Sequence, residues 1–174
     1  MLFNHTLSLL FLLLLVLFTG PLSALTRDSQ QPIEIVSQRQ SLDLNSHRMT
    51  FSGQVVVTQG SIKIHADRVV ITRINNQSGQ EEVEATGTPA TFYQLLEDQQ
   101  PVHGSGQTMQ YHAQKGLLIL QQQARLKLRD NQIQSDRITY HLLQQRVQAE
   151  SAAQQRVKML LWPEQLQQPV KQKP

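Results

Sequence analysis

The sequence predicts an all-β protein built on a long antiparallel sheet, and three observations predict it. Apolar residues recur at every second position in most segments after residue 32, which is the period of a half-buried strand. Short turn sequences rich in Asn, Gly, Asp and Ser separate these segments at close intervals, as hairpins require. The chain of 174 residues contains no cysteine, so backbone pairing and burial must hold it together.

The first 24 residues are expected to form a cleaved export signal. Sixteen of them are apolar, and Leu9 to Phe18 is an unbroken run of ten apolar residues. This run is shorter than the about 20 residues that span a bilayer, and the small residues that end at Ala24 suit a signal peptidase. The segment has no Lys or Arg, so an uncleaved anchor remains the alternative. The rest of the chain is expected to act outside the cytoplasm.

The expected strands follow one another from residue 33 onward, where Ile33 and Ile35 flank Glu34. The same alternation recurs at 55–57, 62–64, 69–71, 126–128 and 138–140, with turn sequences at 45–46, 59–60, 75–76, 78–79 and 130–131. We interpret residues 144–159 as two more strands, although their composition is also compatible with a helix.

A loose internal repeat, in which residues 66–71 resemble 135–140, indicates hairpin units that must stack to bury their apolar faces. The expected product is a long sheet folded over on itself, in one domain over residues 25–163. A flexible tail is expected at 164–174.

The charge pattern gives little support to nucleic-acid binding. The chain has 16 Lys and Arg against 13 Asp and Glu, a net charge of +3. Its longest basic cluster is Arg125, Lys127 and Arg129, at alternate positions. A weak attraction to anionic lipid or to sugar phosphates is the more economical inference from this balance.

Candidate catalytic and metal sites are weak. Residues 103–106 place a serine between two glycines beside a histidine, but we interpret this segment as a hairpin and not as the strand-to-helix turn that a serine nucleophile needs. The acidic cluster of Glu81, Glu82 and Glu84 is expected on a solvated loop or edge, and the histidines lack the spacing of metal ligands. We therefore expect a non-enzymatic protein with no cofactor and no metal.

Seven segments carry a resemblance to a known family, and together they cover residues from about 30 to 168. They are, in chain order, residues 31–35, 41–44, 50–60, 62–70, 89–94, 136–140 and 163–167. They resemble the OstA-like family of periplasmic lipopolysaccharide-transport bridge proteins. The resemblance implies an open, twisted antiparallel β-jellyroll with an apolar groove along its length. It also implies a periplasmic location, after signal cleavage near Ala24.

The resemblance further implies a function and partners. Lipid A acyl chains of lipopolysaccharide would lie in the groove, and copies stacked head to tail would join an inner-membrane export complex to an outer-membrane translocon with OstA-like domains. Groove positions of the family correspond to Ile33, Phe92, Tyr111 and Ala113, where the family usually has a larger aliphatic residue at the last position. Ser29 stands where a family threonine flanks the groove.

The alternating strands are consistent with such a groove. Removing acyl chains from water is favourable by about 0.8 kcal/mol per methylene, so a lipid carrier needs a long apolar trough. If the apolar strand faces converge, the lining consists of Ile33, Ile35, Val55, Val57, Ile62, Ile64, Phe92, Tyr111, Leu126 and Leu128. From periodicity alone, a closed sandwich core is the favoured interpretation of these residues. The resemblance reverses that preference.

Two sheet edges are expected to serve assembly, because an open edge accepts a strand from another chain. The first edge comprises Ile33, Glu34, Ile35 and Val36, and the last comprises Val157, Lys158, Met159, Leu160 and Leu161. Copies joined in this way would grow into a filament. Trp162 is expected in the core of the last strand, with a partner anchor as the alternative. The alternative function is a structural or chaperone-like periplasmic β protein that binds polypeptide at these edges.

Overall fold

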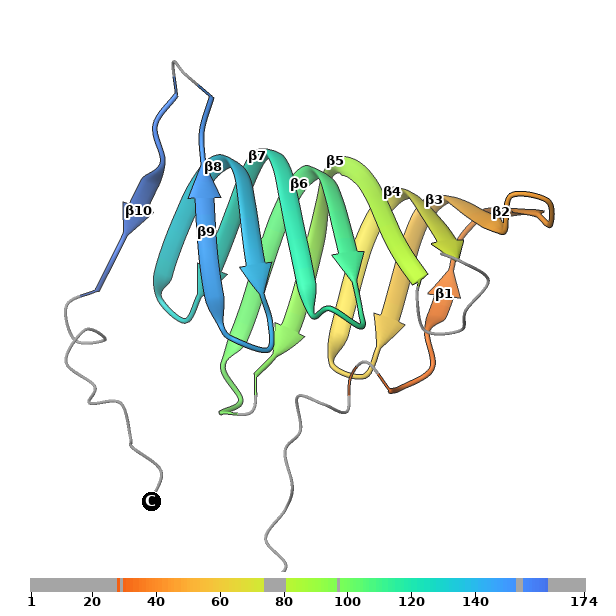
Figure 1. Cartoon of the computed structure of the whole chain (residues 1–174), viewed down its shortest axis with the longest axis horizontal. Coiled ribbons are helices and arrows are strands. Elements are labelled where there is room, and N and C mark those ends of the chain that lie inside the picture. The colour runs from red at the N-terminus through yellow and green to blue at the C-terminus, as the bar shows by residue number, and fades with distance from the viewer. Residues whose placement is uncertain (1–27, 29, 74–80, 97, 153–154, 163–174) are drawn as a thin grey trace, which may run out of the picture.

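One continuous antiparallel sheet makes up almost all of the described chain. The computed structural model describes residues 28, 30–73, 81–96, 98–152 and 155–162, and its strands lie side by side along one axis (Figure 1). The strands are β1 (Glu34–Val36), β2 (Arg39–Asp43), β3 (Arg48–Gln59), β4 (Ile62–Arg73), β5 (Glu81–Leu95), β6 (Pro101–His112), β7 (Leu117–Leu128), β8 (Asn131–His141), β9 (Arg146–Glu150) and β10 (Lys158–Leu160). The predicted all-β class is confirmed.

The order of the strands in the sheet follows the chain. It runs β1-β3-β4-β5-β6-β7-β8-β10, while β2 pairs with a second part of β3 and β9 with a second part of β8. The long strands β3 to β8 arch over at one side of the molecule, so the sheet folds back on itself as two layers (Figure 1). This is the predicted sheet folded over on itself.

The register shifts divide each long strand between the two layers. Layer 1 contains β1, residues 55–59, 62–66, 90–95, 101–105, 124–128 and 131–135, and β10. Layer 2 contains β2, residues 48–52, 68–73, 81–86, 108–112, 117–121 and 137–141, and β9. The described residues of the turns after β3, β5, β6, β7 and β8 lie along the side opposite the bends, which we call the hairpin side (Figure 1).

The bends occur where the backbone leaves the extended conformation. In β3, Gly53 and Gln54 have φ angles of 83° and 47°, and in β7, Gln122 and Gln123 have φ angles of 59° and 58°. Glycine adopts this left-handed region freely, whereas a residue with a Cβ does so at a cost of about 1–2 kcal/mol. The chain therefore tolerates local strain at these bends, which let a single strand run through both layers.

A single apolar core lies between the layers. Its buried members come from β3 to β8 and include Ile64, Phe92 and Leu126 of layer 1 and Leu118 and Tyr140 of layer 2. The residues alternating with the core members face outward, so the predicted period of two corresponds to an inner and an outer face. Within the described ranges, no helix has the length and apolar character needed to cross a membrane.

Several sequence predictions can be compared directly with these elements. Residues 144–159 do contribute two strands, β9 and most of β10. The turn predicted at 45–46 falls between strands, and those predicted at 59–60 and 130–131 each include one strand-end residue, Gln59 of β3 and Asn131 of β8. The turns predicted at 75–76 and 78–79, the export signal, Ser29 and the tail at 164–174 lie outside the described residues. The domain boundaries at 25 and 163 also remain predictions.

The interpretation of residues 103–106 as a hairpin is wrong, because they lie inside β6. Gly104 and Gly106 mark close packing instead of a turn. A Cβ at Gly104 would lie 3.0 Å from Leu120 Cδ1, and one at Gly106 would lie 2.8 Å from the Gln121 carbonyl oxygen. The backbone of β7 thus leaves no room for a side chain at Gly106, and one at Gly104 would press on Leu120. The segment forms no nucleophile turn.

The placement of the acidic cluster on a loop or edge is also wrong. Glu81, Glu82 and Glu84 are partly buried residues of β5, which has a strand on either side. Arg73 Nε lies 3.5 Å from Glu81 Oε1, and His112 Nε2 lies 3.9 Å from Glu82 Oε1. Neighbouring strands thus place basic groups opposite Glu81 and Glu82, which explains why a central strand tolerates these two carboxylates.

Candidate functional site

An unbroken row of inward-facing residues crosses layer 1 from one end of the molecule to the other. Consecutive members are register partners on neighbouring strands. This row, the layer 1 seam, consists of Ile35, Val57, Ile64, Phe92, Gly104, Leu126, Ile133 and Met159. All eight residues are apolar or glycine. The layer 1 seam therefore forms a continuous apolar wall between β1 and β10.

Layer 2 supplies a matching row on the opposite wall. The layer 2 seam consists of Leu42, Met49, Ile71, Val83, Tyr111, Leu118, Tyr140 and Val147. Phe92 of the layer 1 seam and Tyr111 of the layer 2 seam meet across the interior, with ring centroids 6.2 Å apart and ring planes inclined by 48°. The two seams thus enclose one apolar interior that runs the length of the sheet.

The predicted groove residues are brought together by the fold. Seven of them are buried members of the core, and the other four pack against it while partly buried. The buried ones are Val55, Val57, Ile62, Ile64, Phe92, Tyr111 and Leu126, and the partly buried ones are Ile33, Ile35, Ala113 and Leu128. Phe92 is only 1% exposed and Tyr111 only 3%. In this conformation the predicted lining residues pack against one another.

Polar contacts tie the chain ahead of β1 across the hairpin side. The Asp28 carboxylate accepts hydrogen bonds from the Ser61 backbone N–H at 2.8 Å and from Ser61 Oγ at 2.6 Å. It also accepts one from Gln94 Nε2 at 3.3 Å, and Gln94 is 2% exposed. Burial and the negative charge of Asp28 raise the pKa of Tyr111. These hydrogen bonds join the chain ahead of β1 to the turn between β3 and β4 and to β5.

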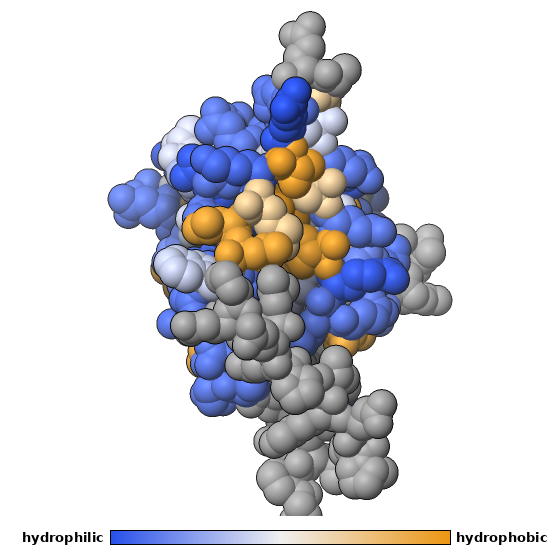
Figure 2. Space-filling view, turned by 90° about the vertical axis from the view of Figure 1, so that its left-hand side faces the viewer, coloured by the Kyte–Doolittle hydropathy of each residue, from blue (hydrophilic) through white to orange (hydrophobic). Residues whose placement is uncertain are grey.

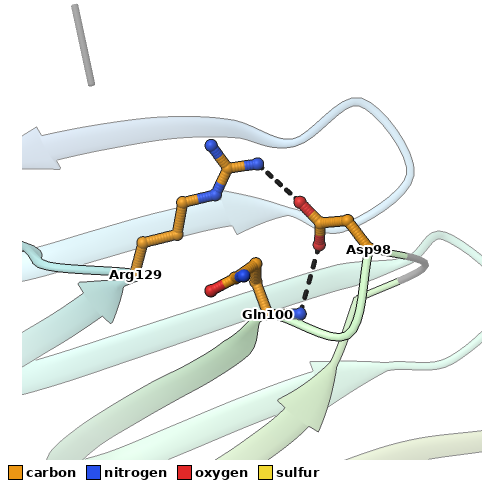
Figure 3. Close-up of polar contacts among 3 residues, drawn as sticks. All are labelled: Asp98, Gln100 and Arg129. Carbon is orange, nitrogen blue, oxygen red and sulfur yellow. Dashed lines mark hydrogen bonds and ion pairs between the residues drawn. The ribbon is translucent and has the colours of Figure 1, made fainter. Parts of the chain in front are cut away.

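A second polar contact joins two adjacent turns of layer 1 on the hairpin side. Arg129, in the turn between β7 and β8, donates from Nη2 to Asp98 Oδ2 at 2.5 Å (Figure 3). Asp98 Oδ1 in turn accepts the Gln100 backbone N–H at 3.2 Å. Beside this contact, Leu96 is buried in the core cluster. The rim of layer 1 therefore places one exposed cation next to the apolar interior.

Both ends of the sheet expose apolar side chains. At the first end, Val36 is 60% exposed, with Leu42 and Leu44 of the adjoining hairpin also exposed. At the last end, an apolar patch lies in the middle of a largely hydrophilic face (Figure 2). The exposed large apolar residues near this end are Leu143, Val157, Met159, Leu160, Leu161 and Trp162. The predicted assembly edges lie at these two ends, because β1 begins the strand order and β10 ends it.

The expectation that Trp162 is a core residue is wrong. The structure places it after β10, where its side chain is 54% exposed. Its backbone N–H donates to Asn131 Oδ1 at 3.1 Å. The hydrogen bond holds the backbone beside β8 and leaves more than half of the side chain exposed. The alternative of a partner anchor stays a prediction.

Some residues of the site were not found from the sequence. The Leu118 side chain belongs to the layer 2 seam and Leu120 to the core, but both lie in an apolar run over residues 117–120 that hides their alternation. Asp28 carries no sequence signal, because its partners Ser61 and Gln94 lie far along the chain. The described residues contain no group of three or more His, Cys, Asp or Glu able to hold a metal ion.

The fold and its interior define the class of protein as an open β-jellyroll whose apolar interior reaches both ends of the sheet. A family model described as LptA/(LptD N-terminal domain) LPS transport protein matches residues 34–146. The chain belongs to this family. The family is one of transport proteins, which confirms the expectation of a non-enzymatic protein and the resemblance that predicted it.

Individual relatives agree with this assignment. The lipopolysaccharide export system protein LptA of Escherichia coli K12 is 44% identical over 147 residues, covering 84% of this chain and 80% of that protein. The protein of the same name from Haemophilus influenzae is 44% identical over 161 residues, covering 92% of this chain and 94% of that protein. The crystal structure of LptH from Pseudomonas aeruginosa matches with a TM-score of 0.72 at 29% identity, covering 79% of this chain and 99% of that chain. This match confirms the predicted jellyroll.

Proposed function

We propose that this chain is a periplasmic carrier that holds the acyl chains of lipopolysaccharide between its two seams and passes the lipid toward the outer membrane. The observation that carries the proposal is the pair of apolar seams, which run without interruption from β1 to β10 in layer 1 and from β2 to β9 in layer 2. LptH is described as the periplasmic component of a conserved lipopolysaccharide transport device, and the two LptA proteins as parts of a lipopolysaccharide export system. Entry of acyl chains would replace contacts between seam residues with contacts to lipid.

Photo-crosslinking tests where the lipid lies. A p-benzoylphenylalanine at position 92 or 111 is expected to form adducts with lipopolysaccharide in cells, because both side chains face the interior. The same group at Glu84 or Gln110, on the outer face of layer 2, serves as the control and is expected to give few such adducts. Adducts with protein alone from positions 92 and 111 would reject the carrier in favour of the chaperone-like alternative.

We further propose that copies and partners join end to end. The exposed apolar patch at the β10 end is expected to pack against the β1 and β2 end of a second copy, which continues the seams from one copy to the next. The partners at the two ends of such a chain would be a component of the inner-membrane export complex and the outer-membrane translocon. Contacts of this heterologous kind extend into filaments.

Charge placed in the β10 patch is expected to block this assembly. The double variant Met159→Asp with Leu161→Asp should remain monomeric at concentrations where light scattering shows that the parent protein assembles. Its self-association should be weaker by about 5-fold to 150-fold, which corresponds to a loss of about 1–3 kcal/mol of binding free energy. Deleting Ile33 to Val36 should also weaken self-association, because it removes β1, the edge that is expected to pack against the β10 end of another copy. The control is Gln107→Asp with Gln114→Asp, which adds the same charge to exposed positions in β6 and in the turn after it, away from both ends of the sheet. Unchanged growth of the β10 variant would count against this interface.

A further inference from the structure

The outer face of layer 1 carries an excess of positive charge that the apolar interior does not explain. Two outward rows of register partners cross this face, one through Lys63, Tyr93, His103 and Lys127, the other through His65, Thr91, Ser105, Arg125, Gln134 and Lys158. Extended to β1, the rows contain four Lys or Arg residues and a single acid, Glu34. Every member of these rows is among the residues that the structure describes. We call them the cationic face.

Layer 2 has a different surface. Its three outward rows of register partners contain five arginines, which are Arg39, Arg48, Arg68, Arg137 and Arg146, and four acids, which are Asp43, Glu82, Glu84 and Glu150. Mixed charge of this kind is sufficient for solubility. The outer face of layer 2 therefore carries nearly equal positive and negative charge, whereas that of layer 1 is almost entirely positive. A surface of one charge sign attracts ligands of the opposite charge, so we look for an anionic ligand of layer 1.

The cations of β7 lead from this face to the rim of the interior. Arg125 and Lys127 point outward at alternate positions, which places them about 7 Å apart along the strand. Arg129 follows in the turn on the hairpin side, where it meets Asp98. The three basic groups thus form a ladder that begins in the turn at the rim of layer 1 and continues along the outer face of β7.

A shallow hollow of about 290 Å³ lies on this face beside the ladder. Its walls include the two cations Arg125 and Lys127 and the aromatic pair Tyr93 and His103. These two rings hold each other in an edge-on contact, with centroids 5.2 Å apart. Gln132 adds an amide to the lining. Cations, a fixed aromatic wall and an amide together suit a phosphorylated sugar.

We propose that the Arg125, Lys127 and Arg129 ladder and this hollow bind the phosphorylated saccharide of the lipopolysaccharide whose acyl chains lie between the seams. The inference rests on the proposed carrier function and adds the polar half of the ligand to it. The saccharide leaves the interior at the hairpin side and crosses the turn between β7 and β8. A phosphate there displaces Asp98 from Arg129, and further phosphates meet Lys127 and Arg125.

The test compares two sets of three charge removals. The variant Arg125→Gln, Lys127→Gln and Arg129→Gln is expected to bind lipopolysaccharide about tenfold more weakly than the parent protein, as three exposed charge contacts contribute modestly each. The control Arg39→Gln, Arg48→Gln and Arg146→Gln removes the same charge from exposed positions of layer 2 and should bind as the parent does. Equal losses in both variants would overturn the inference, because they would reflect net charge alone.

The lipid and the salt concentration provide the second comparison. Lipopolysaccharide freed of phosphate with aqueous hydrofluoric acid should bind the parent protein as weakly as intact lipid binds the ladder variant. Binding of intact lipid to the parent should weaken between about 50 and 500 mM salt, a range over which the screening length falls severalfold, and the ladder variant should lack most of this dependence. Phosphate-independent binding by the parent would overturn the inference.

Two further readouts separate the parts of the proposal. Asp98→Asn frees Arg129 without removing a cation and should tighten binding about twofold to threefold, in keeping with an exposed ion pair. Unchanged or weaker binding would show that Arg129 does not contact the saccharide. Crosslinking from position 92 should persist in the ladder variant at saturating lipid. If crosslinking is absent even in the parent protein, it is the carrier function that fails, and not the saccharide site alone.

Discussion

Replacing Phe92 with alanine is expected to lower the free energy of unfolding by about 3–5 kcal/mol, a large part of the stability of a single domain. The side chain is 1% exposed, contacts Tyr111 across the interior and lies opposite Gly104 in the layer 1 seam. Its register partners are Ile64 of β4 and Gly104 of β6. Because Gly104 has no side chain, β6 offers nothing at that position to fill the space that the ring leaves. The cost is therefore expected at the upper end of the range for this substitution.

The control for this substitution is Thr91→Ala, which changes the adjacent residue on the outer face. It is expected to change the free energy of unfolding by less than about 0.5 kcal/mol, as surface substitutions usually do. Urea unfolding followed by circular dichroism measures both variants. A cost below about 1 kcal/mol for Phe92→Ala would show that the interior is loosely packed before lipid binds, in contradiction to the burial of the seams.

The sequence was most informative where the alternation is clean. Ile62 with Ile64 and Leu126 with Leu128 flank charged or polar residues, so a period of two is visible, and all four belong to or pack against the core. Successive residues of a strand point to opposite faces, so the apolar residues of such a pair lie on the same face. The buried face of these strands can therefore be predicted from the sequence. The two-layer fold follows from the same pattern once neighbouring hairpins must share a core.

The residues that the sequence did not place correctly lie where neighbouring strands pack closely. In residues 117–120 all four side chains are apolar, yet Ile119 lies outside the core cluster that contains Leu118 and Leu120. Glycines at 104 and 106 usually signal a turn, but here they give room to Leu120 and to the backbone of β7. Such close approaches between strands depend on register, which the local sequence does not record.

The polar groups of the site illustrate the same limit. Asp28 contacts Ser61 and Gln94, and Asp98 contacts Arg129, over sequence separations of 33, 66 and 31 residues. The ladder of Arg125, Lys127 and Arg129 was visible as alternate basic residues, but only the register shows that the outward rows through Arg125 and Lys127 contain no acid beyond Glu34 of β1. The sequence thus supplies the residues of the candidate site, and the fold determines which of them act together.

Strongly alkaline solution is expected to destabilise the protein through its two buried seam tyrosines. Burial, and the negative charge of Asp98, raise the pKa of Tyr140 to about 12, and burial is also the main cause of the raised pKa of Tyr111. The folded state therefore holds both phenols in the neutral form. This contribution is complete below the ordinary tyrosine pKa of about 10 and is lost as the pH rises from there toward 12, by up to about 1.4 kcal/mol per pH unit for each tyrosine.

Tyr140→Phe separates this effect from general alkaline damage. The Tyr140 hydroxyl oxygen is buried and has no hydrogen-bond partner among the described residues, so removing it should cost little at neutral pH and can stabilise the fold. At about pH 11, where an exposed tyrosine is largely ionised, the variant should retain roughly 1–2 kcal/mol more stability than the parent protein. Urea unfolding at both pH values measures the difference. Identical losses in parent and variant would mean that Tyr140 ionises without unfolding the layers, and that water already reaches the layer 2 seam.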